Sequence, residues 1–213
     1  MSRGVVFCAA VGAVLAASPA AFAQRSWAGA DDRYHKHQGM FLRLDAGGAY
    51  LKSSTTVSGS DTSLSGPAAS FGFSLGGNLI EDLSFFGHLG LSIAPNPSAS
   101  SGGISSSTSD ASLNFVSIGP GVNYYFMPYN FYVSGMVLVT RITTTQGGTS
   151  GSTNAGFGAK VAIGKEWWVA DHWGIGVAGQ FTFGSNEDRD TGTGPAPTWT
   201  TITPALAFSA SFN

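Results

Sequence analysis

Residues 156–183 read GFGAKVAIGKEWWVADHWGIGVAGQFTF, and they contain two alternating stretches separated by a short turn at 170–172. In each stretch large apolar side chains alternate with glycine, alanine or polar residues, which is the period-two pattern of a β-strand. One face of each strand is therefore apolar and the other is small or polar. A barrel in lipid turns its apolar face outward, and the small residues on the other face suit a narrow barrel interior. The pattern thus favours a barrel surrounded by lipid.

The same pattern occurs eight times, and each predicted strand reaches or exceeds the ~9–11 residues that a tilted strand needs to cross a bilayer. The predicted strands cover approximately residues 39–51, 68–79, 83–94, 112–126, 131–143, 156–168, 173–183 and 199–212. Backbone groups cannot stay unpaired in hydrocarbon, so spanning strands must close on themselves. The sequence predicts an all-β protein that forms an eight-stranded antiparallel up-and-down transmembrane β-barrel.

The connections between these strands alternate between very short turns and long segments rich in serine, threonine and glycine. The long segments are expected to be loops at residues 52–67, 95–110, 144–154 and 184–198. Three short turns lie on the opposite side, together with the start of the first predicted strand and the end of the last one. Bacterial barrels place short turns in the periplasm and long loops outside, so we expect four polar loops on the cell surface.

The first 23 residues have the features of a secretory signal peptide: Arg3, an apolar run at 5–17 and Ala-Phe-Ala at 21–23. We expect cleavage before Gln24, a flexible periplasmic lead over 24–38 and an outer-membrane barrel domain over 39–213. Removing Arg3 leaves nine basic and twelve acidic residues, and no basic surface predicts binding to nucleic acid.

Aromatic residues gather near both ends of the predicted strands, as in the girdles of membrane barrels. On the long-loop side they include Trp199, at the base of a loop. The girdles are predicted to contain Tyr50, Phe71, Tyr124, Phe126, Trp167, Trp173, Phe183 and Phe212.

From about residue 39 to its end the chain resembles small eight-stranded outer-membrane barrels of the OmpA-transmembrane, OmpX and opacity-protein type. The resemblance rests on GKEWWV at 164–169, on WGIGV at 173–177 and on the aromatic-ended final strand at 205–212. It implies a Gram-negative outer-membrane location, contact with membrane lipid and lipopolysaccharide, and assembly by the barrel-insertion machinery. It carries no catalytic motif with it.

Several polar side chains fall on the inward face, where charges must pair or face trapped water. We predict a polar network in the lumen made of Arg43, Asp45, His88, Lys160, Glu166 and Gln180. Arg43 and Asp45 are expected to pair with charges on other strands. Such a network can simply fill the barrel, or it can form a gate or a proton path. Phe86, Met136 and Leu138, which also point inward, would plug the lumen.

Residues that could carry catalysis or bind a metal are sparse. His88 and Ser92 share an inward face four residues apart, whereas lipid A deacylases place a His-x-Ser pair on the lipid-facing side. Because the nucleophile–base geometry is missing, we expect no catalytic residue, and we also expect no cofactor. His35 and His37 are too few ligands for a metal site, so they are interpreted as part of a solvated tail.

The function predicted from these features is non-enzymatic. We expect a monomeric integral outer-membrane protein whose polar loops act in envelope integrity, adhesion or recognition, with a surface ligand that the sequence does not define. Two alternatives stay open: a porin-like narrow channel or carrier for small solutes, and an envelope lipid-modifying enzyme, which the missing catalytic geometry disfavours.

Overall fold

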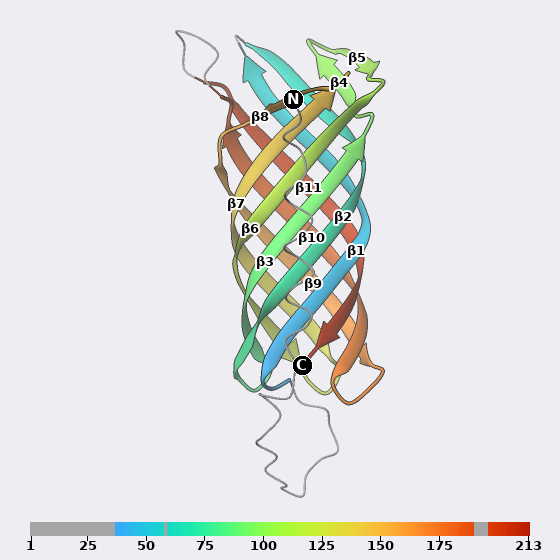
Figure 1. Ribbon diagram of the computed structural model, residues 1–213, viewed down its shortest axis with the longest axis vertical. Helices are drawn as coiled ribbons and strands as arrows, with labels where there is room; N and C mark the ends of the chain where they lie inside the picture. Colours follow the sequence, from blue (N-terminus) through green and yellow to red (C-terminus); the bar gives the residue numbers. More distant parts are fainter. Residues whose placement is uncertain (1–36, 58, 190–195) are drawn as a thin grey trace, which may run out of the picture. The chain divides into compact units, whose positions relative to one another are not determined.

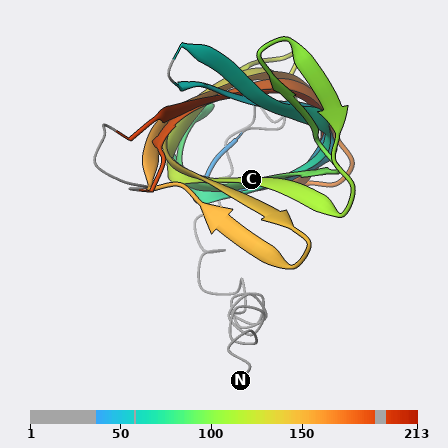
Figure 2. The same cartoon turned by 90° about the horizontal axis from the view of Figure 1, so that it is seen from above.

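The computed structural model describes residues 37–57, 59–189 and 196–213 as one antiparallel sheet that closes on itself (Figures 1 and 2). Because β1 pairs with both β2 and β11, the ring has no open seam. Within the described ranges, eight strands make up the ring: β1 (Met40–Val57), β2 (Ser60–Ile80), β3 (Leu83–Pro95), β6 (Ala111–Phe126), β7 (Phe131–Gln146), β9 (Gly156–Trp168), β10 (Trp173–Glu187) and β11 (Thr198–Phe212). The predicted eight-stranded antiparallel barrel is confirmed. The predicted signal peptide and residues 24–36 of the lead lie outside the described residues.

Side chains alternate along each strand between an exposed apolar face and a buried face. In β10, Ile175 and Val177 are 51% and 41% exposed, whereas Gly176 and Ala178, which each follow one of them, are buried. The small inward residues are needed because the interior is narrow. A Cβ added to Gly164 would lie 2.5 Å from the Tyr132 ring. No helix in the described part of the chain is long and apolar enough to cross a membrane.

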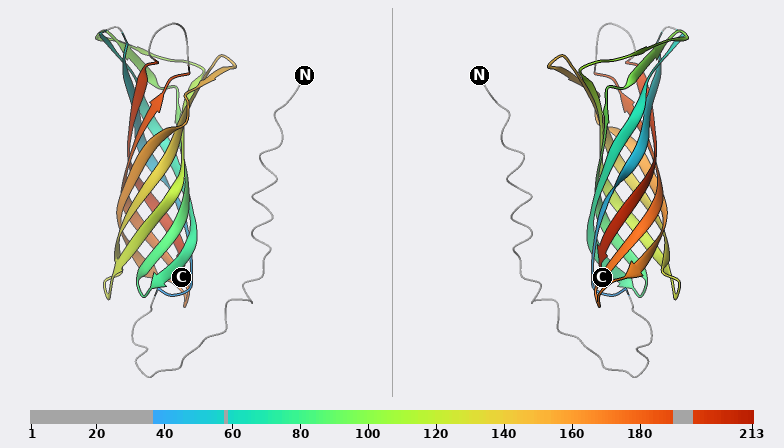
Figure 3. Two further views of the ribbon diagram at one scale, coloured as in Figure 1. Left: turned by 90° about the vertical axis from the view of Figure 1, so that its left-hand side faces the viewer. Right: turned by 90° about the vertical axis from the view of Figure 1, so that its right-hand side faces the viewer.

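Three segments that the sequence analysis assigned to loops are largely strand, so those predictions were wrong. Residues 52–67 are the paired ends of β1 and β2, which turn at Gly59 with a φ of +81°. The second segment contains β4 (Ser98–Ser101) and β5 (Ile104–Ser107), and the third contains β8 (Thr149–Ser152). Serine and threonine here complete backbone ladders with a neighbouring strand, and threonine fits a pleated surface well. These extensions project at one end of the barrel, the loop end (Figure 3). The end with the short turns is the turn end.

The lumen contains two apolar layers. The turn-side layer consists of Phe41, Phe86, Tyr125, Tyr132, Met136, Leu138, Ala162 and Ala178. The loop-side layer consists of Leu51, Ala68, Ala94, Leu113, Phe115 and Ile142. All fourteen side chains are 8% exposed or less. Large inward residues therefore fill the barrel at two levels, while small and polar residues occupy the space between them.

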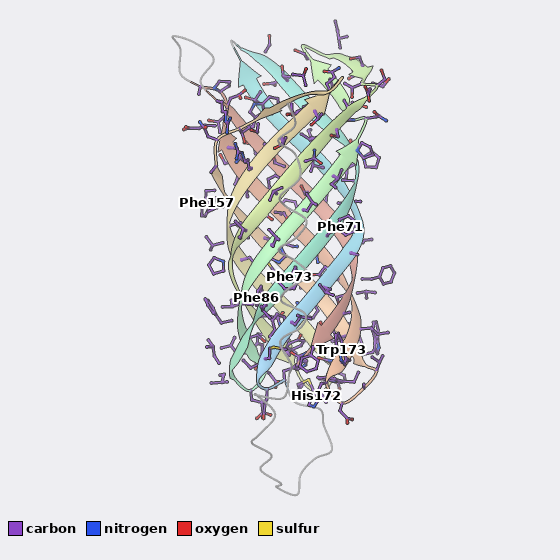
Figure 4. All side chains as sticks on the ribbon, viewed as in Figure 1. Phe71, Phe73, Phe86, Phe157, His172 and Trp173 are labelled. Atoms are coloured by element: carbon purple, nitrogen blue, oxygen red, sulfur yellow. The ribbon has the colours of Figure 1, made fainter. Side chains whose placement is uncertain are left out.

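The outer wall carries the aromatic residues predicted for the girdles. Seven of the eight are 37–50% exposed, and Phe212 is half-buried against Trp173, at 5.4 Å between ring centroids. Trp173 lies near the turn end, and Phe71 lies farther from that end (Figure 4). Trp199 does not belong to the girdle, which corrects the sequence interpretation. It is paired with Asn186, a fully buried residue, and shares its inward direction.

Candidate functional site

Arg43 on β1 is the centre of a buried polar network near the turn end. Its Nη2 donates to Glu166 Oε1 at 2.9 Å and to the Tyr125 hydroxyl at 2.7 Å, and its Nη1 donates to Asn123 Oδ1 at 3.3 Å. The guanidinium also lies 3.9 Å from the centre of the Tyr132 ring, within the range of a cation–π interaction. Arg43 is thus held by residues from β6, β7 and β9, and it pairs with a charge on another strand.

Glu166 on β9 is the second charged residue of this network and accepts its remaining hydrogen bonds. Its Oε2 accepts hydrogen bonds from Ser211 Oγ at 2.8 Å and from the Tyr125 hydroxyl at 3.1 Å. The Arg43–Glu166 contact is the one ion pair within 4.0 Å among the described residues, and both side chains are 3% exposed or less. Hydrogen bonds to both members of a buried ion pair offset part of its loss of hydration, although Arg43 Nε is buried without a partner among the described residues.

The remaining predicted lumen residues form a second group. His88 Nδ1 lies 2.9 Å from Ser74 Oγ, and Lys160 Nζ lies 3.4 Å from His88 Nε2. Asp45 and His88 flank Gly72, whose added Cβ would lie 3.1 Å from Asp45 Oδ2 and 3.2 Å from His88 Cε1. Gln180 is 8% exposed and belongs to the same interior.

The expected ion pair of Asp45 is not formed in the described part of the chain. Its Oδ1 is buried and has no hydrogen-bond partner there, although Arg43 and Lys160 attract the carboxylate through space and Gln180 hydrogen-bonds to the side chain. The prediction for Asp45 was therefore wrong in this respect, whereas the side chain does point inward and is 8% exposed. Small neighbours such as Gly72 leave Asp45 beside His88 instead of against a cationic head group.

His88 does not work with Ser92, because Ser92 Oγ bonds to Ser70 Oγ at 3.3 Å. The serine at His88 is Ser74, which the sequence analysis did not single out. Both residues are 2% exposed and lie inside the barrel. A signal was present in the inward phase of β2, since Ser74 and His88 occupy directly paired positions of β2 and β3.

The turn end is closed by His37, which the sequence analysis had placed in a solvated lead. That interpretation was wrong for this residue, because His37 is fully buried. Its ring stacks on Tyr125 at 3.4 Å and its Nε2 lies 2.9 Å from Asn130 Oδ1. The Asn78 amide donates to Gly39 O at 2.9 Å and fixes the segment that carries His37. Burial lowers the pKa of His37 below its ordinary value, because the charged imidazolium loses hydration there.

The loop end contains a pocket of about 160 Å³ above the loop-side layer. Its apolar floor includes Leu113 and Ile142, and Trp199 and Asp188 form part of its wall. Trp199 Nε1 donates to Asp188 Oδ2 at 3.3 Å. Trp199 was predicted to lie in the aromatic girdle of the outer wall, and this prediction was wrong. The alternation counted back from Thr201 would have given its inward direction.

A larger groove of about 800 Å³ crosses β1, β9, β10 and β11. Most of its lining is exposed apolar surface of the outer wall, including Phe181, Val161 and Leu206. Gly48 and Gly179 pair with Leu206 from either side. Because glycine has no side chain, the outer surface is recessed at these two positions. The groove is thus a depression in the apolar belt.

No group of three or more histidine, cysteine, aspartate or glutamate side chains in the described ranges could hold a metal ion. Many polar groups of the lumen, such as Arg43, Glu166 and Tyr125, hydrogen-bond to one another. Two places in the described part of the chain could take up a small molecule: the pocket at the loop end and the groove on the outer wall.

An eight-stranded ring with an apolar outer wall and a polar, filled lumen defines the outer-membrane type of β-barrel. Among solved structures, the chain is similar to Neisserial surface protein A (NspA), with a TM-score of 0.57, 17% identity and coverage of 82% of this chain and 96% of that chain. It is also similar to the outer membrane protein OprG from Pseudomonas aeruginosa, with a TM-score of 0.50, 13% identity and coverage of 84% and 99%. No family model and no curated protein matches the sequence. The likenesses confirm the resemblance to small outer-membrane barrels, and at these identities they concern the fold alone.

Proposed function

We propose that this protein is a non-enzymatic integral outer-membrane protein with a closed lumen and a recognition surface at its loop end. The observation that carries the proposal is the filling of the lumen. Two apolar layers cross it, and the Arg43–Glu166 ion pair bridges β1 and β9 within the turn-side part. A barrel filled in this way has a scaffold role, and any specificity lies at its exposed end.

The outer wall supports a location in the membrane. Large apolar side chains such as Leu206 and Phe208 are 76% and 74% exposed, which would be unfavourable in water over such an area. Hydrocarbon removes this cost, and the lipid chains would also fill the groove over Gly48 and Gly179. Lipid and lipopolysaccharide are the expected surroundings, after export with a cleaved signal peptide and assembly by the barrel-insertion machinery of a Gram-negative envelope.

The lumen supports a role without catalysis or free passage. Ser74 and His88 are within hydrogen-bonding distance, but both are enclosed between the apolar layers. A substrate would have to displace Phe86, Met136 or Leu138, which are 8% exposed or less. Neither a lipid-modifying enzyme nor a solute channel is favoured by this packing.

The loop end supports recognition because paired strands continue into it. β1 and β2 stay in register as far as Val57 and Ser60, and β4, β5 and β8 add short ladders. Backbone pairing gives these segments fixed positions, which a binding surface needs. This surface would face the outside of the cell, with the barrel as a monomer.

Single-channel conductance in a planar bilayer tests the proposal. The refolded protein, verified as a heat-modifiable barrel, should give no steady openings. Steady openings that change when Arg43 or Lys160 is neutralised would contradict the closed lumen and support the narrow channel. Turnover of lipid A or phospholipid that is lost in His88→Ala would instead support an enzyme.

The orientation is tested separately in intact cells. A cysteine introduced in place of Ser105 of the loop end should react with a membrane-impermeant maleimide added outside. A cysteine in place of Asp171 of the turn end should react only after the envelope is opened. The reverse pattern would overturn the proposed surface.

A further inference from the structure

We propose that the pocket at the loop end binds one neutral sugar ring, with Trp199 as its aromatic platform and Asp188 as the acceptor of its hydroxyl hydrogen bonds. This proposal rests on the proposed function in one respect only, namely that the loop end faces outside. The chemical argument comes from the pocket itself.

Trp199 is positioned by the barrel and not by a flexible loop. It belongs to β11, is paired with Asn186 of β10, and packs against the loop-side layer. It remains partly exposed at the pocket wall. Its indole N–H is already satisfied by Asp188 Oδ2 at 3.3 Å. The ring is thus held in a fixed direction, and a fixed aromatic surface binds with little loss of conformational entropy.

Asp188 is fixed from several sides. Its amide donates to Pro197 O at 2.8 Å, its carbonyl accepts from Asn154 Nδ2 at 3.2 Å, and its Oδ1 accepts from the Arg189 amide at 2.8 Å. An ionised carboxylate has about four acceptor sites, of which two are used within the described residues, by the Arg189 and Trp199 bonds. The remaining sites can accept from hydroxyl groups, and hydrogen bonds to a charged acceptor are the stronger kind.

The rest of the pocket combines an apolar floor with hydroxyl groups at its walls. Leu113 and Ile142 form part of the floor, and the half-buried Thr144 and Ser152 contribute hydroxyls. A sugar ring has the complementary surface, since one face presents C–H groups and the rim presents hydroxyls. Small-molecule sites commonly show this mixture of apolar lining and a few polar groups.

Charge and volume narrow the ligand class. Among the described residues, the pocket lining includes a carboxylate and no basic side chain, so an acidic or sulfated sugar would be repelled. A purely apolar solute would leave Asp188 without the hydroxyl or water partners that it needs. The volume of about 160 Å³ corresponds to about five waters at ~30 Å³ each, which suits one ring and excludes a longer chain lying inside.

The test follows the indole N–H resonances of ¹⁵N-labelled protein in phosphocholine micelles, because detergents with sugar head groups would compete. Methyl glycosides of glucose, galactose and mannose are titrated to roughly 100 mM, a hundredfold above the about millimolar dissociation constant expected for so small a ligand. At least one should shift the Trp199 resonance, assigned by its loss in Trp199→Phe. The resonances of Trp167 and Trp173 on the outer wall should not move.

Two variants and two ligand controls make the result specific. Asp188→Asn should weaken binding about tenfold, because the charged acceptor is lost, whereas Trp167→Phe should leave it unchanged. Methyl glucuronide and cyclohexanol should bind at least tenfold more weakly. The proposal is overturned if no neutral glycoside moves the Trp199 resonance of the folded barrel, or if cyclohexanol binds as well as the glycosides.

The same spectra separate the two sources of such a sugar. Smooth lipopolysaccharide that shifts Trp199, while core-only lipopolysaccharide does not, would identify the glycan of the cell's own envelope. A shift with free glycosides alone would identify a glycan from outside. A conducting lumen would contradict the proposed closed barrel without changing this binding, so the two failures are distinguishable.

Discussion

Arg43 and Glu166 are 123 residues apart in the chain, yet Nη2 of the first lies 2.9 Å from Oε1 of the second. The pair joins β1 to β9 through the inside of the barrel. Tyr125, Asn123 and Ser211 hydrogen-bond to the two groups, so this network links strands across the inside of the barrel in addition to the backbone pairing around its wall.

Removing one charge of this pair should destabilise the barrel strongly. In Glu166→Gln the buried guanidinium of Arg43 loses its counterion, which costs about 3–5 kcal/mol. Urea unfolding in lipid vesicles measures the change in the free energy of unfolding. The double variant Arg43→Met with Glu166→Gln removes both charges and should be more stable than Glu166→Gln alone. Equal stability of wild type and Glu166→Gln would contradict a role of the pair in holding the barrel.

Replacing glycine by alanine should destabilise the barrel at a position that faces the lumen and not at one that faces the outside. Gly164→Ala places a Cβ 2.5 Å from the buried Tyr132 ring, and such overpacking costs about 1–3 kcal/mol. Gly179→Ala on the next strand is the matched control, because its Cβ would meet no atom within 4 Å. The same unfolding experiment should show a loss for the first variant and almost none for the second. A larger loss for Gly179→Ala would mean that the facing of these strands is wrong.

The two kinds of tryptophan should differ in their contact with lipid. Trp167 and Trp173 are 47% and 43% exposed on the outer wall, whereas Trp199 points into the barrel mouth. In variants that keep a single tryptophan, brominated lipid chains should quench the fluorescence of Trp167 and Trp173. Trp199 should be quenched much less. Equal quenching of all three would place Trp199 back in the aromatic girdle.

The docking of His37 should weaken as the pH falls. Burial lowers the pKa of His37 in the docked state below the ordinary value near 6.5. Above that value the imidazole is neutral in both states, so docking has its full strength. At lower pH the released segment binds a proton that the docked one resists, and this favours release. Hydrogen exchange of the Asn78 and Asp82 amides, which bond to Gly39 O and His37 O, should therefore become faster relative to intrinsic rates.

The control for this pH effect is His37→Phe, which keeps an aromatic ring against Tyr125 and has no titrating group. Its exchange at Asn78 and Asp82 should not depend on pH beyond the intrinsic rates. Persistence of the pH effect in this variant would assign it to a group other than His37.

Of two adjacent phenylalanines, only the one that points into the lumen should affect conductance when it is removed. Phe86 is 1% exposed within the turn-side layer, and Phe85 is 49% exposed on the outer wall. Removing two plug side chains in Phe86→Ala with Leu138→Ala should produce openings in planar bilayers and cost several kcal/mol of stability, at about 2–5 kcal/mol for each large residue. Phe85→Ala should remain silent. Silence of the double variant in a folded barrel would show that other lumen residues close the path.

Much of the fold could be predicted from the sequence because side chains in a strand alternate strictly between two faces. Once Ile175 and Val177 are assigned to the lipid side, Gly176 and Ala178 must face the lumen, and a shift by one residue would reverse the whole strand. The inward directions of Arg43, His88 and Lys160 follow in the same way. The number of strands in the ring, the direction in which their side chains point and the closure of the sheet could therefore be predicted from local patterns.

The strand ends and the partners inside the lumen could not be predicted in this way. Serine- and threonine-rich segments such as 52–67 have the composition of a loop. This segment is strand because its two halves, the end of β1 and the start of β2, pair with each other. The inward face of β1 does not say whether Arg43 meets Asp45, Glu166 or another acid, because the register between distant strands decides it. Asp45 remained without an ion pair in the described residues for the same reason.

The sequence by itself determined an inside-out barrel, since the period of two and the closing of backbone hydrogen bonds in lipid are local or general requirements. Only the tertiary structure decided that His37 stacks on Tyr125, that Arg43 pairs with Glu166 and that Trp199 meets Asp188 over an apolar floor. Each of these contacts depends on strand register and on the radius of the closed ring. Those quantities arise from the packing of all eight strands together.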